Sequence, residues 1–183
     1  YSLKTSFETS SQLVYNYVIS EENSSSMWNL YEQFGNTQYM LERARKECAV
    51  EGEGNPAMIG VALIMHSLIA QLLTDTYGNV PYSQAGLLAL QDDNWEYTPK
   101  YDNQKDIYID LLRSMEEANA CFNKAKEMKS AGTLSNINFN SRYDYMYNGD
   151  VDKWQRFGNS LYLRILMRVS NKVVEESDGI ISL

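Results

Sequence analysis

Histidine and cysteine are scarce in this sequence, and their scarcity excludes several kinds of site. His66 is the single histidine in 183 residues, so neither a zinc site nor a histidine-based catalytic pair is predicted. It lies in an uncharged segment, where a hydrogen-bonded core residue is a better interpretation than a base or a ligand. Cys48 and Cys121 are too few for a disulfide framework, although they leave one bridge open. With no other catalytic pattern, we expect a non-enzymatic protein that needs no cofactor.

Positive charge is also in short supply. The 16 lysines and arginines are outnumbered by 24 acidic residues, and the net charge of −8 argues against a nucleic-acid partner. Five basic residues nevertheless follow helical steps near the end of the chain: Lys153, Arg156, Arg164, Arg168 and Lys172. They fit either an anionic ligand or lipid head group, or a partly buried face that pairs with acidic helices. The acidity of the rest of the chain favours the second interpretation.

Proline is absent after Pro99, and no alternation typical of a β-sheet persists anywhere. The periodicity instead predicts four helices, over residues 27–48, 56–77, from 104 to beyond 122, and 150–170. Ser24, Ser25 and Ser26 are candidate caps for the first helix. We therefore expect a mostly α fold, a bundle of antiparallel helix pairs similar to tetratricopeptide pairs, with long irregular loops but no visible sequence repeat.

The second predicted helix has no charged side chain over 19 residues, from Pro56 to Thr74. A bilayer-spanning helix needs about 20 apolar residues. This segment contains His66 and Gln71, and its flanks are acidic rather than basic, which disfavours a membrane span. We expect a helix that is buried on nearly all sides.

The fourth predicted helix has the clearest apolar face, which is formed by Trp154, Phe157, Leu161, Ile165 and Val169. Asp150 follows a turn-forming Asn148-Gly149 pair and is placed to cap the first turn. Trp154 and Phe157 head this face, so we predict that both are core anchors.

A loop of about 25 residues, from Gly78 to Asp102, separates the second and third predicted helices, and loops of this length are often functional. Aromatic rings can bind the apolar faces of sugars while neighbouring polar groups bond the hydroxyls. We therefore predict ligand binding by Trp95, Tyr97, Asp93 and Asn94. Alternatively, the rings pin the loop to the helices, which stays open for Trp95 and Tyr97 and is the stronger interpretation for Tyr82 and Tyr101. The acidic cluster of this loop, Asp92, Asp93, Asn94 and Glu96, lacks the spacing of a calcium loop, so no metal site is predicted.

Four segments, in order, resemble one known family. Residues 150–170 are similar to its "GD…KW…FANSLRLRLAMRIS" segment, 72–85 to "LTDLYGDVPYSEA", 99–108 to "PKYDSQEEIY", and 111–118 to "LL…LDEA". These are motifs of the SusD/RagB family, the nutrient-binding lipoproteins of Gram-negative outer membranes. The resemblance covers roughly residues 28–172.

The resemblance implies a helical protein held by an N-terminal lipid on the extracellular face of the outer membrane. It also implies capture of an oligosaccharide or, as in the RagB-like branch, a peptide, and delivery to a TonB-dependent transporter. The lipid-bearing cysteine of the family is not in this sequence, and family members are much longer. We expect residues 1–183 to be a single helical domain, the N-terminal portion of a longer protein. The alternative from another class is a helical protein-interaction scaffold without a small-molecule ligand.

Overall fold

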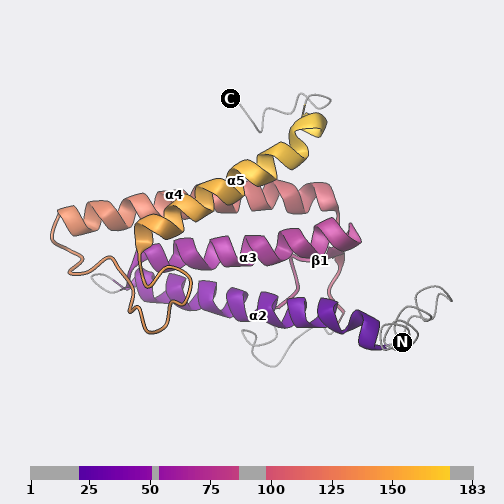
Figure 1. Ribbon diagram of the computed structural model, residues 1–183, viewed down its shortest axis with the longest axis horizontal. Helices are drawn as coiled ribbons and strands as arrows, with labels where there is room; N and C mark the ends of the chain where they lie inside the picture. Colours follow the sequence, from indigo (N-terminus) through magenta and orange to yellow (C-terminus); the bar gives the residue numbers. More distant parts are fainter. Residues whose placement is uncertain (1–20, 51–53, 87–97, 174–183) are drawn as a thin grey trace, which may run out of the picture.

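The computed structural model describes residues 21–50, 54–86 and 98–173, and these ranges are mostly helical, as predicted. The elements are α2 (Glu21–Ala49), α3 (Pro56–Tyr77), β1 (Val80–Pro81), β2 (Tyr101–Asp102), α4 (Gln104–Ser130) and α5 (Val151–Val173). Successive helices run in opposite directions, with α2, α3 and α4 side by side and α5 running obliquely across α4 (Figure 1). The predicted antiparallel helix pairs are therefore confirmed.

Helix α3 lies at the centre, because it packs against α2, α4 and α5. Its start is fixed by Asn55, whose side chain accepts a hydrogen bond from the Ala57 amide at 3.0 Å, with proline in the next position. It ends at Gly78, which has a φ of 74° and donates its N–H to Thr74. Although α3 is long and apolar enough to cross a membrane, 72% of its most apolar 18-residue stretch is buried within this protein. It is the core helix that the sequence predicted.

Helix α2 begins at Glu21, six residues earlier than predicted. The prediction that Ser24, Ser25 and Ser26 cap the helix is therefore wrong, because they lie inside its first turns. Serine is acceptable in a helix as well as at its start, so a run of serines marks a helix end only weakly.

Helix α4 begins at Gln104, as predicted, and buries one apolar stripe. Its buried residues include Tyr108, Leu111, Leu112, Met115, Ala118 and Phe122, which face the core at intervals of three and four. Cys121 on this helix and Cys48 on α2 are both free thiols, so the bridge that the sequence left open is not formed.

Helix α5 packs on α4 through an apolar face that is narrower than predicted. Asp150 caps the helix by accepting a hydrogen bond from the Lys153 amide at 3.1 Å. Trp154, Leu161 and Ile165 are buried, which confirms Trp154 as an anchor. Phe157 is only partly buried, so its assignment as a full core anchor is wrong. Its ring lies at the margin of the core, 6.1 Å from the ring of Trp154.

The loop before α5 is organised around one carboxylate. Asp144 accepts hydrogen bonds from the backbone amides of Met146, Tyr147 and Gly149, and from the indole nitrogen of Trp154 at 2.7 Å. Burial alone would raise the pKa of Asp144, but the hydrogen bonds, that of Trp154 foremost, outweigh burial and hold it below its usual value. The loop and the first turn of α5 are therefore fastened together.

Candidate functional site

The long loop between α3 and α4 is closed at its base by a short antiparallel strand pair, β1 with β2. Val80 lies opposite Asp102, and Pro81 lies opposite Tyr101. The hydroxyl of Tyr31 on α2 donates to the Pro81 carbonyl at 3.0 Å, which ties β1 to the helices. Both ends of residues 82–100 are thus held beside the helical layer.

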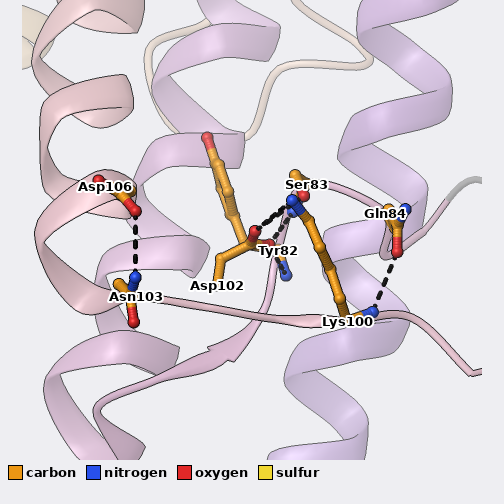
Figure 2. Close-up of polar contacts among 7 residues, drawn as sticks. All are labelled: Tyr82, Ser83, Gln84, Lys100, Asp102, Asn103 and Asp106. Carbon is orange, nitrogen blue, oxygen red and sulfur yellow. Dashed lines mark hydrogen bonds and ion pairs between the residues drawn. The ribbon is translucent and has the colours of Figure 1, made fainter.

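The carboxylate of Asp102 fastens the two ends of the loop to each other (Figure 2). One oxygen, Oδ2, accepts hydrogen bonds from the amides of Tyr82 and Ser83 at 3.1 and 2.7 Å. The other, Oδ1, accepts from the Ser83 hydroxyl at 3.0 Å and forms an ion pair with Lys100 at 3.3 Å. Burial acts to raise the pKa of Asp102, yet these hydrogen bonds lower it below its usual value. The Asp102 carboxylate is therefore charged at neutral pH.

Two amide side chains extend this arrangement. Gln84 accepts a hydrogen bond from the Lys100 amide at 3.0 Å, which adds a second cross-link between the two sides of the loop (Figure 2). Asn79 accepts from the Gln104 amide at 3.0 Å, at the first residue of α4. The same turn that ends α3 therefore also helps to start α4.

Tyr82 anchors the first side of the loop to the core. Its hydroxyl donates to Asp110 on α4 at 2.5 Å, and its ring lies 5.8 Å from that of Phe34 and 6.0 Å from that of His66. Burial, with Asp110 adding to it, raises the pKa of Tyr82, so its hydroxyl stays protonated and donating. The prediction that Tyr82 pins the loop is confirmed.

Tyr101 does not have the same role. Its side chain is 74% exposed, so the prediction that its ring pins the loop is wrong. The backbone of Tyr101 pairs in β2, and its ring projects from the strand pair into solvent. The four predicted ligand residues, Asp93, Asn94, Trp95 and Tyr97, lie outside the described residues, and so does the rest of the acidic cluster.

His66 is a core residue, as predicted. Its side chain is 6% exposed, its ring centroid lies 4.2 Å from that of Phe34, and its Nδ1 lies 3.2 Å from the Thr37 hydroxyl. Burial lowers the pKa of His66 to about 4, with Asp110 opposing the shift and Arg45 adding to it. The imidazole is therefore neutral at pH 7.

All five basic residues of α5 are exposed, so the predicted partly buried basic face is wrong, although three of the five contact other side chains of the described residues. Arg168 forms an ion pair with Asp75 on α3 at 3.2 Å, and Arg164 donates to Gln71 on α3 at 2.6 Å. Lys153 pairs with its own helix cap, Asp150, at 3.6 Å. Pairing with an acidic neighbour is thus confirmed for Arg168, while Arg164 contacts a neutral amide instead.

Comparisons with known proteins identify the family. Residues 2–180 match the model of the SusD-like family described as "Starch-binding associating with outer membrane". The chain belongs to this SusD-like family, as the sequence motifs predicted. No curated protein matches the sequence significantly.

Solved structures share the fold. A protein described as a chitin-binding protein is 30% identical, with a TM-score of 0.63 over 88% of this chain and 31% of its own. A SusD/RagB family protein from Bacteroides thetaiotaomicron is 25% identical, with a TM-score of 0.61 over 85% of this chain and 28% of its own. A SusD homologue from Bacteroides fragilis is 27% identical, with a TM-score of 0.55 over 78% and 26% of the two chains. The chain therefore spans about a third or less of the length of these relatives.

Proposed function

We propose that this chain contributes to non-enzymatic capture of an oligosaccharide at the outer surface of the outer membrane, through Trp95, Tyr97, Asp93 and Asn94. In this proposal, a longer protein is held at the extracellular face by an N-terminal lipid and passes its ligand to a TonB-dependent transporter. Family membership and the description of one relative as chitin-binding support this function.

The observation that carries the proposal is the double anchoring of the loop. Asp102 fastens its two ends to each other, and Tyr82 fastens its first side to α4. A loop held in this way can present aromatic and amide side chains from a rigid scaffold, which limits the entropy lost when a ligand binds.

A double variant, Trp95→Ala with Tyr97→Ala, tests the proposal. We expect it to weaken the binding of chitin or starch oligosaccharides by at least about tenfold, because each stacked ring contributes on the order of 1 kcal/mol or more. Tyr143→Ala with Tyr145→Ala is a matched control, since these tyrosines are 78% and 94% exposed in another loop.

Isothermal titration calorimetry and thermal melts distinguish the outcomes. Unchanged oligosaccharide affinity in the loop variant, or its unfolding, would show that the rings are structural. Binding of peptides in place of oligosaccharides would favour the RagB-like alternative. If neither ligand class binds, a protein-interaction scaffold becomes the better hypothesis.

A further inference from the structure

Helix α5 has an outer side that no other element of the described chain covers. Its inner side packs against α4 and α3, and the helix runs obliquely across α4 (Figure 1). On the outer side two large apolar side chains are exposed, Leu163 at 59% and Met167 at 70%. They border a shallow hollow of about 390 Å³, whose lining is completed by Ser160, Arg164 and Arg168. Helix α5 therefore presents apolar groups to solvent as well as to the core.

Basic side chains are interleaved with these two apolar side chains. At about 100° per residue, seven residues fall within about half of the circumference of the helix: Leu163, Met167, Lys153, Arg156, Arg164, Arg168 and Lys172. All seven are exposed. These seven residues, which we call the outer face of α5, combine positive charge with apolar surface over a length of about 30 Å.

Three positive charges of the outer face are not neutralised by a neighbouring carboxylate. Arg164 contacts the neutral amide of Gln71, and Arg156 and Lys172 form no ion pair with any residue that the structure describes. The whole chain is acidic, but charges are screened over about 8 Å at physiological ionic strength. A surface that touches the outer face is therefore attracted or repelled mainly by the charges of this face.

We propose that the outer face of α5 docks on a membrane surface that carries anionic, phosphate-bearing lipid headgroups. Lysine and arginine side chains are attracted to such headgroups, and apolar side chains among them leave water at the boundary with the acyl chains. A small soluble anion would contact only part of a face of this length and would leave Leu163 and Met167 in water. This docking uses none of the loop residues proposed above to bind an oligosaccharide.

Cosedimentation of the 183-residue chain with lipid vesicles tests the docking. We expect binding to vesicles of phosphatidylglycerol mixed with phosphatidylcholine, weaker binding as salt is added, and no binding to phosphatidylcholine alone. Each basic residue near an anionic membrane strengthens binding about fivefold, so Arg156→Gln with Lys172→Gln should weaken it about 25-fold. These two side chains are the best targets because their replacement breaks no ion pair of the described chain.

A matched control removes the same amount of charge elsewhere. Lys46 on α2 and Lys124 on α4 are both exposed and lie outside α5. We expect Lys46→Gln with Lys124→Gln to leave vesicle binding within about twofold of the original chain, since charges away from the contact are screened. An equal loss in this control and in the Arg156 and Lys172 variant would overturn the proposal, because the attraction would then depend on net charge alone.

A second double variant isolates the apolar part of the outer face. Leu163→Ser with Met167→Ser keeps every charge, and thermal melts should be unchanged because both side chains are exposed. We expect vesicle binding to weaken at least about fivefold, since two apolar side chains no longer leave water on docking. Unchanged binding of this variant would refute the contact that the proposal assigns to them.

The remaining outcomes identify a different occupant. The proposal fails if the original chain does not bind phosphatidylglycerol vesicles at low salt. Binding of inorganic phosphate without vesicle binding would make the outer face a site for a soluble anion. Binding of polyglutamate without vesicle binding would assign it to an acidic protein instead.

Discussion

Replacing Trp154 tests the link between α5 and the loop before it most directly. The indole is 4% exposed and lies 5.2 Å from the ring of Tyr147 in an edge-to-face arrangement. It also donates its N–H to Asp144 at 2.7 Å. Trp154→Ala therefore removes packing, an aromatic pair and a charge-assisted hydrogen bond together.

A second variant separates the hydrogen bond from the other two contributions. Truncating a buried tryptophan to alanine costs about 3–5 kcal/mol. For a protein of this size, a loss of 1 kcal/mol lowers the melting temperature by about 2–4 °C, so we expect a decrease of about 6–20 °C. Trp154→Phe keeps most of the ring but not the N–H donor, and we expect it to cost about 1.5–3 kcal/mol, the contribution of a hydrogen bond to a charged group.

Urea and thermal unfolding followed by circular dichroism give both values. Lys153→Ala is the matched control, because the neighbouring Lys153 is exposed and its surface ion pair contributes at most about 1 kcal/mol. If Trp154→Ala were no more destabilising than this control, the assignment of the buried face would be refuted. If Trp154→Phe were as stable as the original chain, the hydrogen bond to Asp144 would contribute nothing net.

Three further changes test other parts of the fold. Burial lowers the pKa of His66 to about 4 in the folded protein, whereas the unfolded chain has the ordinary value of about 6.5. Unfolding therefore takes up a proton below pH 6.5, and the free energy of unfolding should fall by roughly 3 kcal/mol between pH 6.5 and 4. Urea melts of His66→Gln should lack this part of the pH dependence. A methyl group added at Gly158 would lie 2.6 Å from Cδ1 of Ile64. Ile64→Val removes Cδ1, so Gly158→Ala should cost about 1–3 kcal/mol less stability in the Ile64→Val protein than in the original chain, as measured by a double-mutant cycle. Gly149 has a φ of 82°, and a Cβ there would lie 2.1 Å from the Phe139 carbonyl oxygen. Gly149→Ala should therefore lower the free energy of unfolding, measured by chemical denaturation, by well over ~1 kcal/mol. A loss below about 0.5 kcal/mol, the size of a surface substitution, would contradict this geometry.

The helices were predictable because their information is local. The start of α3 is specified by Asn55 and Pro56, and its end by Gly78, all within one turn of the boundary. The stripe on α4 has the helical period, which indicates the buried face without knowledge of its partner. Phe157 was misassigned because periodicity gives the direction of a face but not its width. Phe157 lies between the buried Trp154 and Leu161 along the helix, but at the edge of the face, where its neighbours cover it only in part.

The anchoring of the loop was not predictable in the same way. Two-residue strands such as β1 and β2 are too short to show alternation. The two carboxylates that hold the loop are distant from Tyr82 in sequence. Asp102, which accepts a hydrogen bond from the Tyr82 amide, is 20 residues away, and Asp110, which accepts one from the Tyr82 hydroxyl, is 28 residues away. No local pattern distinguishes these carboxylates from others in an acidic chain. The family segments around Tyr82 and Asp102 marked the right regions, but not the contacts between them.

The contacts of Asp102 at the base of the loop also affect how such a protein can change during evolution. Since the ends of the loop are joined at Asp102, Ser83 and Gln84, residues inserted between Gln84 and Lys100 extend a closed loop and leave the contacts of the helices intact. Doubling the length of a closed loop costs only about 0.6 kcal/mol in chain entropy. Sequence between the two anchors is therefore free to diverge in length and chemistry, while selection for folding acts mainly on the few residues at its base.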